Sequence, residues 1–498
     1  MKLKYVIAVC LVLSLMAGCT RHNEVPITSL QQLNDSRYTI GYGEGHSAYT
    51  AIKELLPNAK LHSFNNHITG FEAARLGKID GYAYDRLQLE LAIDNGLSGV
   101  RILDENLGDP IDIAVGLSPV SKIPDLEKKI NAFLAEIIAD GNLKKMESRW
   151  LNEGNDTMPD IPEASEPKYH LTVGTTADVP PYSYYKGTML TGMDIELAKR
   201  FALWLGADLE FKIYDFNGII AAALAGDIDC IMANLNITKE RKEKIAFSDP
   251  FFSMANTIMV RDSGQKSDGS GMWKRLSSSF EKTFVREARW KLIAKGIGVT
   301  IIISTLAALF GTLLGFGICA LRMSGNRLLD GVALGYIRIM QGTPIVVLLM
   351  ILFYVVFAKT GLSSILVAVI GFGMNFGAYV SEMIRTGILA VDKGQMEAAL
   401  ALGYPKFKAF NKIVLPQAAQ YFLPVFQGEF ISMVKMTSVV GYIAIQDLTK
   451  AGDIIKSRTF EAFFPLIVIA VIYFIIAWLL TRILVALQNH FDPKRRRK

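Results

Sequence analysis

The side chains that most often perform catalysis are few in this chain, and they are scattered along it. The 498 residues include four cysteines and six histidines. The cysteines, at positions 10, 19, 230 and 319, form neither a disulfide framework nor a zinc-binding pattern. Neither a nucleophile–base pair nor the GxxxxGKS/T loop that binds nucleotide phosphates can be found. We therefore expect no catalytic residue, no metal site and no cofactor, and a chain that cannot hydrolyse ATP alone.

The composition excludes several classes of protein. Hydrophobic residues make up 51% of the chain, charged residues 20%, and the mean hydropathy is +0.29. The formal net charge is +6, but five of these charges are the tail residues 494–498, KRRRK. A disordered chain, a collagen-like chain and a basic nucleic-acid binder are all excluded.

Residues 1–18 have the pattern of a secretory signal. Lys2 and Lys4 precede a short apolar run, whereas a helix that spans a bilayer needs ~20 apolar residues. The run ends in Ala17-Gly18-Cys19, which resembles the lipobox of bacterial lipoproteins. That resemblance implies a lipid on Cys19 and export of the residues that follow, with an ordinary signal peptide as the alternative.

The rest of the chain divides into two halves suited to different solvents. Residues 25–262 alternate short strand-like runs with helical patterns, which predicts an α/β domain. A polar Gly/Ser linker follows at 262–271, and residues 275–290 are predicted to form an amphipathic helix on the outer membrane surface. We then predict an all-α membrane domain of five spans, at 294–321, 339–358, 364–390, 420–444 and 464–487.

The distribution of lysine and arginine predicts the orientation of these spans. The loops after the first and third spans and the C-terminal tail are basic, whereas the opposite side carries Lys359 and a mixed-charge stretch at 447–461. Basic loops stay in the cytoplasm. The tail is therefore predicted to be cytoplasmic and the α/β domain to be outside, although the basic stretch at 274–291 would then also lie outside.

One cytoplasmic loop resembles a known motif. Residues 397–416, EAALALGYPKFKAFNKIVLP, match the EAA loop of ABC importer permeases, and the stretches at 341–349, 377–388 and 434–443 are similar to the polar amino acid branch of that family. The resemblance covers residues 291–487. It implies a separate ATPase subunit that docks on Glu397, Ala398 and Ala399, with Gly403 allowing the chain to reverse.

Four charged residues, Glu382, Arg385, Glu429 and Lys435, lie within or near the predicted spans. Charges at membrane depth are costly and face an aqueous or protein interior. We interpret Glu429 and Lys435 as candidates for the path of a zwitterion, with helix pairing or interfacial snorkelling as the alternatives.

The exported half is similar to bacterial amino acid-binding proteins, but with its parts in an unusual order. Residues 28–110 resemble the second lobe of that family, 111–151 the segment that returns to the first lobe, and 171–261 the first lobe. We interpret this order as a circular permutation. The alternative is two partial domains, each completed by another copy.

The resulting domain division has four parts: a signal peptide 1–18, a substrate-binding domain 19–262, a linker with an amphipathic helix 263–290, and a permease domain 291–498. Within the substrate-binding domain, lobe two covers 25–110, and the return segment with lobe one covers 111–262.

The resemblance also implies a ligand site. Arg241 stands where the family places the arginine that binds the ligand carboxylate, and Asp85 where it places the acceptor of the ligand ammonium. A guanidinium binds a carboxylate through two parallel hydrogen bonds, which lysine cannot reproduce. The alternatives are a surface arginine and a helix-capping aspartate.

Weaker matches complete the predicted site. They are the turn Gly45-His46-Ser47, where His46 replaces a hydroxyl residue, the aromatic Phe216, and Asn234, Asn236 and Tyr182. Phe216 has core packing as its alternative. Asp178 has only a weak claim to contact, and Val179 stands where an aromatic side chain is frequent.

Together these features predict a subunit of an ATP-driven ABC importer in the bacterial inner membrane, in which a receptor for a polar, glutamine-like amino acid is fused to its permease. Two copies of the chain and an ATPase are its expected partners. A ligand-gated channel and an exported, membrane-anchored enzyme are the rival interpretations.

Overall fold

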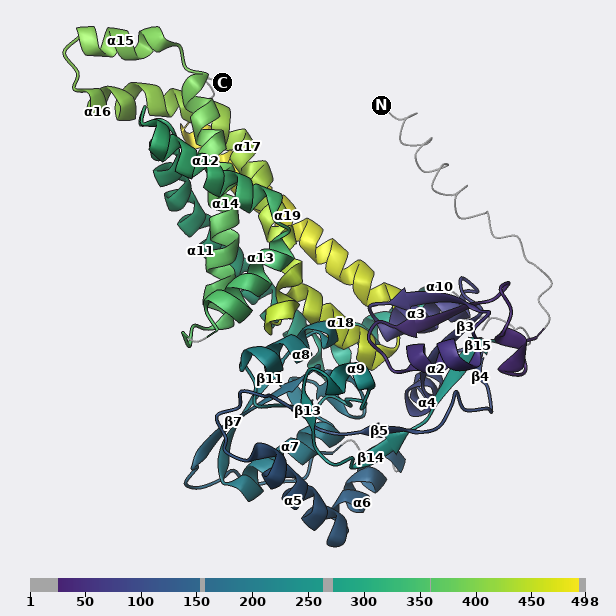
Figure 1. Ribbon diagram of the computed structural model, residues 1–498. Helices are drawn as coiled ribbons and strands as arrows, with labels where there is room; N and C mark the ends of the chain where they lie inside the picture. Colours follow the sequence, from purple (N-terminus) through teal and green to yellow (C-terminus); the bar gives the residue numbers. More distant parts are fainter. Residues whose placement is uncertain (1–25, 153–156, 263–271, 359, 492–498) are drawn as a thin grey trace.

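The computed structural model describes residues 26–152, 157–262, 272–358 and 360–491 (Figure 1). The signal peptide with Cys19, the linker residues 263–271 and the basic tail therefore lie outside the described residues. The described chain consists of an α/β part, which ends at Asp262, and a helical part, which begins at Met272.

Lobe two is built around a five-stranded sheet of order β2-β1-β3-β15-β4, in which β15 is antiparallel to both of its neighbours. The central strand β3 is buried along its whole length, as expected of a strand covered on both faces. The strands are β1 (Thr39–Gly43), β2 (Lys60–Phe64), β3 (Gly81–Asp85), β4 (Val100–Ile102) and β15 (Asn256–Arg261). The helices are η1 (Gln31–Leu33), α2 (Ala48–Leu55), α3 (His67–Arg75) and α4 (Arg86–Asp94).

Lobe one has a second sheet with the same pattern, of order β11-β7-β12-β6-β13, in which β6 is antiparallel to its neighbours. Its strands are β6 (Gly116–Leu117), β7 (Tyr169–Thr175), β11 (Ala207–Ile213), β12 (Cys230–Ile231) and β13 (Ala246–Phe247). A smaller sheet holds β8 (Asp178–Val179), β9 (Ser183–Lys186) and β10 (Met189–Thr191). The helices are α5 (Leu126–Ala139), α6 (Asn142–Glu147), η2 (Ser148–Asn152), α7 (Met193–Leu205), α8 (Phe216–Ala225) and α9 (Lys239–Lys242).

Two short strands connect the lobes. The chain leaves lobe two through β5 (Ile111–Ile113) and returns through β14 (Phe252–Met254), and these strands pair antiparallel. After this return, Asn256–Arg261 enters the sheet of lobe two as β15. The sequence resemblance groups this strand with lobe one. It instead fills an interior position of the other sheet, and its first five residues are buried.

The helical part contains long helices and several short, bent segments. It begins with α10 (Met272–Phe280), η3 (Glu281–Val285), η4 (Arg286–Ala288), α11 (Trp290–Arg322), α12 (Arg327–Gly342), α13 (Ile345–Ile351) and η5 (Leu352–Val356). It continues with α14 (Ser364–Leu389), α15 (Lys393–Ala401), α16 (Lys406–Ala409), η6 (Phe410–Val414), α17 (Leu415–Met436), η7 (Thr437–Ile443), α18 (Leu448–Thr459) and α19 (Phe463–Phe491).

Among the described residues, three helices are long and apolar enough to cross a membrane, namely α11, α14 and α19. Two further candidates are bent pairs. Arg327–Gly342 meets Ile345–Val356 at 109°, and Lys406–Ile443 meets Leu448–Thr459 at 60°. By length and composition, the described residues thus contain three unbroken candidate spans, or up to five if each bent pair is one span.

Close packing of α11 against α14 depends on glycine. A Cβ atom added at Gly311 would lie 2.6 Å from the carbonyl oxygen of Gly373, and one at Gly377 would lie 3.0 Å from that of Gly311. Small residues let helix backbones approach in this way, which is how membrane helices gain packing energy.

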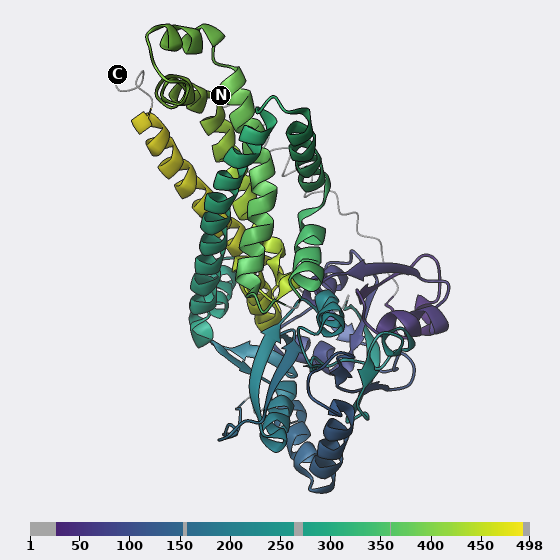
Figure 2. The same cartoon turned by 60° about the vertical axis from the view of Figure 1, so that its left-hand side comes forward.

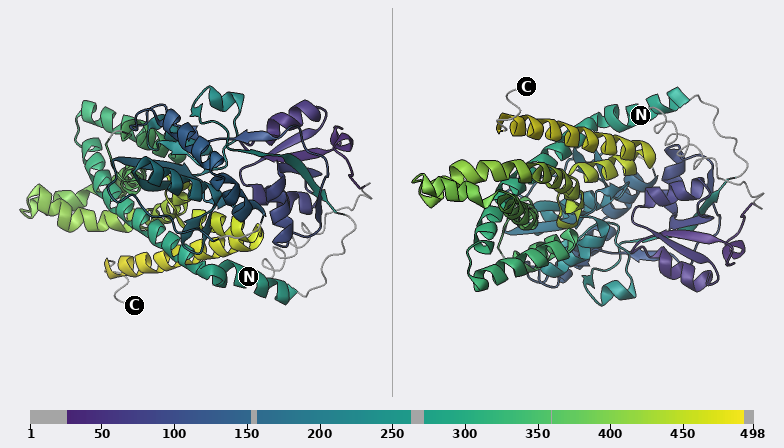
Figure 3. Two further views of the ribbon diagram at one scale, coloured as in Figure 1. Left: turned by 90° about the horizontal axis from the view of Figure 1, so that it is seen from below. Right: turned by 90° about the horizontal axis from the view of Figure 1, so that it is seen from above.

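The two parts of the chain meet at one end of the helical part. Figures 1 and 2 show the α/β lobes at this end and α15 and α16 at the opposite end. Seen from below, in Figure 3, the two lobes lie side by side. The short helix α18 packs against β8 and β9 of lobe one. Just beyond α18, Phe460 and Ala462 join the hydrophobic cluster of lobe two. One segment of the helical part therefore contacts both lobes.

Candidate ligand-binding site

A cavity of about 330 Å³ lies between the two lobes, and its walls come from three parts of the chain. Lobe two contributes His46, Asn66, His67 and Tyr84. Lobe one contributes Thr176, Asp178, Asp215, Phe216, Asn234 and Asn236. The helical part contributes Tyr442, Lys450 and Asp453. Four residues predicted from the sequence, His46, Phe216, Asn234 and Asn236, are therefore brought together at one cavity.

Arg241 lies beside this cavity and joins the lobes. The side chain of Thr238 caps α9 by accepting a hydrogen bond from the backbone N–H of Arg241. The guanidinium donates to the carbonyl oxygens of Asn236 and, across the cleft, of Gly45, both at 2.8 Å. It also lies over the ring of Phe216 at 5.2 Å. Burial lowers its pKa to about 10, so the group stays charged at neutral pH.

Asp85 is almost completely buried, at 2% exposure, and does not line the cavity. It is the last residue of β3 and caps α4, where its carboxylate accepts from the Leu87 N–H at 2.8 Å and from the Tyr182 hydroxyl at 3.2 Å. Burial raises the pKa of Asp85 to about 7. The structure thus pairs Asp85 with Tyr182, and it places this pair apart from the cavity lining that Phe216, Asn234 and Asn236 share.

Residues 45–47 form a turn before α2, as predicted from the sequence. Gly45 has a φ of +71°, a conformation that glycine adopts without strain. The Ser47 hydroxyl is buried and accepts from the Asn256 side-chain amide at 3.4 Å. This turn places His46 in the cavity wall and presents the Gly45 carbonyl to Arg241.

Two imidazoles flank one tyrosine in the cavity wall. His46 and His67 lie on either side of Tyr84, with ring centroids 4.4 and 5.2 Å from it and small interplanar angles. Burial lowers the pKa of both histidines to about 3, so both are neutral at physiological pH. The sequence does not single out His67, because a histidine at the start of a helix has no distinguishing pattern.

Three buried polar atoms of the lining have no hydrogen-bond partner within the described chain. They are His67 Nε2, Thr176 Oγ1 and Asn234 Oδ1. Buried polar groups are rarely left unpaired, because their desolvation is costly. The cavity therefore offers unused hydrogen-bonding capacity to a polar ligand. No group of three or more His, Cys, Asp or Glu side chains within the described ranges is arranged to hold a metal ion.

The predicted permease residues lie away from this cavity. Glu429 is half-buried on α17 and Lys435 is exposed near its end. Glu382 pairs with Arg385 at 3.0 Å and with Arg322 at 3.3 Å, which links α14 to α11. In the loop at residues 391–416, Glu397 and Ala398 are exposed, Ala399 is buried, and Gly403 has a φ of +83°.

Comparisons with known proteins identify the helical part. Residues 297–497 match the model of the "Binding-protein-dependent transport system inner membrane component" family. A glutamine transport system permease protein of Rickettsia felis is 36% identical over 193 residues, which are 38% of this chain and 88% of that protein. The L-cystine transport system permease protein of Bacillus subtilis is 33% identical over 219 residues, which are 44% of this chain and 94% of that protein.

A crystal structure of an amino acid ABC transporter with histidines is 33% identical, with a TM-score of 0.37, and the match covers 47% of this chain and 100% of that one. From the sequence relatives, the chain belongs to the family of inner membrane components of binding-protein-dependent ABC transport systems. It is thus a multi-pass membrane protein and a transport component rather than an enzyme, and the ATPase of such systems is a separate subunit.

Proposed function

We propose that this chain is both the receptor and the permease subunit of an ATP-driven importer for a polar amino acid. The observation that carries the proposal is the composition of the cavity wall, to which both lobes and the permease helix α18 contribute. A receptor cleft that opens onto its own permease can pass a ligand directly into the membrane domain. Glutamine is the substrate that the family resemblance suggests.

Lobe closure captures the ligand on the outer side of the membrane. In the ligand-bound state, Arg241 binds the α-carboxylate and Asp85 accepts from the α-ammonium, with Ser47 nearby. Because Asp85 is buried against Tyr182 outside the cavity lining, lobe closure must move the Tyr182 hydroxyl aside so that the ligand ammonium takes its place. Support comes from the contact of Arg241 with Gly45 across the cleft, since an arginine that bridges the lobes can exchange a carbonyl for a ligand carboxylate. A ligand that binds the closed form more tightly drives the hinge motion.

The binding domain is a circular permutation of the usual two-lobe order, with boundaries at 19–262. Two features support this. Strands of this one chain complete both sheets, and the helices α5 and α6 that follow the first crossing precede β7, β11 and β12, the parallel strands of their own lobe. Joining the usual termini through the segment at 153–167 requires only that they lie close together, which is common in domains.

The complete transporter contains two copies of this chain and an ATPase. The loop with Glu397, Ala398, Ala399 and Gly403 docks on the ATPase in the cytoplasm, and Glu429 and Lys435 contribute to the path between the two copies. Support for this orientation comes from Figure 1, where α15 and α16 lie at the end opposite the lobes. Cys19 is the lipid attachment site. The lipid anchors the mature N-terminus to the outer face of the inner membrane.

Uptake by sealed vesicles tests the proposal. Vesicles that contain the chain and its ATPase should accumulate radiolabelled glutamine when ATP is supplied to the ATPase side, without an added binding protein. Arg241→Ala should abolish this uptake. Passive current through the chain in the absence of ATP would instead support a ligand-gated channel, and would overturn the proposal.

A further inference from the structure

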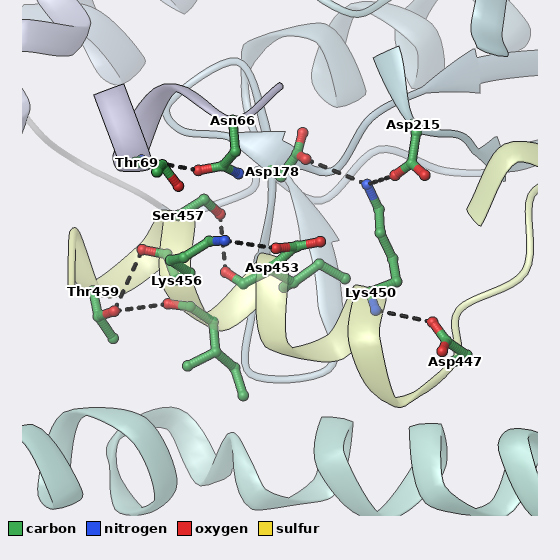
Figure 4. A network of polar contacts seen from close by, with 12 residues as sticks. Asn66, Thr69, Asp178, Asp215, Asp447, Lys450, Asp453, Lys456, Ser457 and Thr459 are labelled. Carbon is green, nitrogen blue, oxygen red and sulfur yellow. Dashed lines mark hydrogen bonds and ion pairs between the residues drawn. The ribbon is translucent and has the colours of Figure 1, made fainter. Parts of the chain in front are cut away.

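A lysine of the permease occupies the ligand cavity. The ammonium of Lys450 lies 2.7 Å from Asp215 Oδ1 and 3.3 Å from Asp178 Oδ2, and the side chain is only 4% exposed. Figure 4 shows Lys450 extending from α18 to these two carboxylates of lobe one. Because all three residues line the cavity, the ion pairs are part of its wall.

The backbone around Lys450 fixes this position. Asp447 caps α18 by accepting from the Lys450 N–H at 2.9 Å, so the lysine lies in the first turn of the helix. Next to it, the Asp215 N–H donates to the carbonyl oxygen of Gly441. A Cβ atom at Gly441 would lie 2.5 Å from Asp215 Oδ2, so only glycine permits this approach without a shift of the carboxylate.

The charged side chains that line the described cavity are mostly acidic, and Arg241, which lies beside it, bonds to carbonyl oxygens rather than to a carboxylate. Among the described lining residues, the binding domain contributes the carboxylates Glu44, Asp178 and Asp215, but neither lysine nor arginine. His46 and His67 are neutral at physiological pH. Without Lys450, Asp178 and Asp215 would face each other with no cation between them, and like charges at this spacing repel.

We infer that Asp178 and Asp215 form a subsite for a cationic ligand side chain, and that Lys450 competes for this subsite when the receptor docks on the permease. This inference rests on the proposed function and narrows the polar substrate to a basic amino acid such as lysine or arginine. Buried Thr176 Oγ1, which lacks a partner, lines the same cavity and can accept a hydrogen bond from such a side chain.

In this scheme, Lys450 helps to release the bound amino acid from the binding domain. A ligand ammonium or guanidinium and the Lys450 ammonium cannot occupy the same pair of carboxylates at once. Docking on α18 then exchanges one cation for the other without leaving a buried charge unpaired. The ligand side chain is freed at the place where the cavity meets Tyr442 of the permease.

Calorimetry on the full chain in nanodiscs tests this inference with two matched ligands. Arginine and citrulline have nearly the same shape, but only arginine is charged. Lys450→Met should raise the affinity for arginine and lysine by roughly tenfold, about 1.4 kcal/mol, and leave that for citrulline and glutamine unchanged. Lys450→Gln should have the same effect. Asp178→Asn with Asp215→Asn, in the Lys450→Met chain, should remove the preference for arginine.

Lys282→Met is the control, because Lys282 pairs with Glu461 at 3.0 Å and neither residue lines the cavity. It should leave the affinity for arginine unchanged. An equal effect of Lys450→Met on arginine and citrulline, or no effect, would overturn the inference. Binding of glutamine alone would also overturn it but would leave the proposed function intact, whereas binding of no amino acid by any variant would contradict both.

Discussion

Arg241 is the residue in which the predicted chemistry and the observed geometry meet most closely. The sequence resemblance assigns it a ligand carboxylate, and the structure shows its guanidinium already bound to carbonyl groups of both lobes. Arg241→Ala should weaken ligand binding by about 2–4 kcal/mol, as expected when a buried, charge-assisted hydrogen bond is lost. Calorimetry measures this directly. Arg241→Lys should restore little of the lost ligand affinity, because an ammonium cannot form the two parallel hydrogen bonds that a guanidinium makes to a carboxylate.

The pKa of Asp85 makes a second prediction at this scale. Burial raises that pKa to about 7, and the ionised carboxylate binds a ligand ammonium much more strongly than the neutral acid does, because its hydrogen bond is charge-assisted. Ligand affinity should therefore be constant above pH 7 and should fall below it, by up to about tenfold per pH unit. His46 and His67, with pKa values of about 3, do not titrate in this range.

Titrations of ligand affinity between pH 5 and 8 measure this dependence. Asp85→Asn, which cannot ionise, should bind more weakly and show a flat profile. If that variant kept the slope of the parent chain, Asp85 would not be the group that accepts from the ligand.

The sequence can place side chains at a common cavity where they follow a family pattern, but it cannot do so where the partner residue is distant along the chain. Phe216, Asn234 and Asn236 can be placed because they follow strand and helix signals of lobe one. Lys450 cannot, because it lies 235 positions from Asp215 along the chain. A lysine in a mixed-charge loop gives no sign of the carboxylates that it will meet.

Among the secondary-structure elements, the helices of the return segment are joined to lobe one by a buried carboxylate. Glu196 on α7 is fully buried and accepts hydrogen bonds from Arg149 and Trp150 at the end of that segment and from Arg200 on its own helix. Glu196→Gln should destabilise the chain by about 3 kcal/mol, because it removes the buried anion with which two partly exposed arginines pair. Thermal unfolding followed by circular dichroism measures the loss.

A matched substitution separates this effect from a general loss of charge. Glu210 is half-exposed on β11 and pairs with His170 at the surface, at 3.1 Å. Glu210→Gln should change stability by no more than about 1 kcal/mol, as is usual for surface ion pairs. Equal effects of the two substitutions would show that Glu196 does not hold the return segment in place.

Phe460 attaches the other lobe to the permease. It follows α18 with a φ of +52°, which a phenylalanine rarely adopts, and it is buried in the hydrophobic cluster of lobe two. Phe460→Ala removes this contact at a cost of about 3–5 kcal/mol to docking. We expect ligand binding by the chain to persist while ATP-driven uptake falls.

The neighbouring Phe463 provides the control for this prediction. It is 46% exposed, so Phe463→Ala should leave uptake near the parent level. Equal uptake by the Phe460 variant and the parent chain would show that lobe two does not dock through this residue.

At the element scale, hydrophobic periodicity and composition predict the α/β region and the apolar helices. They do not predict the bends that divide some of these helices. The predicted second span, 339–358, is divided by the bend between α12 and α13. Pro344 caps α13 in an extended conformation, which is the physical reason for the bend. The resemblance assigns the strand at 256–261 to the wrong lobe, because sequence order does not show where a chain crosses between sheets.

For the whole molecule, the central question is whether one chain both captures the ligand and admits it to the membrane. The lobes and α18 line one cavity. In the proposed importer, tethering keeps the receptor at a local concentration of roughly mM at the mouth of the permease. A soluble receptor would have to find that mouth by diffusion. The fused arrangement removes this search, so transport should saturate with ligand and show no dependence on an added binding protein.

The decisive measurement is ATP-driven uptake by vesicles in which the only receptor is the α/β part of this chain. We predict uptake of an amino acid that requires ATP and ends when Arg241→Ala is introduced into the same chain. If uptake proceeded at the parent rate in that variant, or began only after a separate binding protein was added, the α/β part would not be the receptor of its own permease.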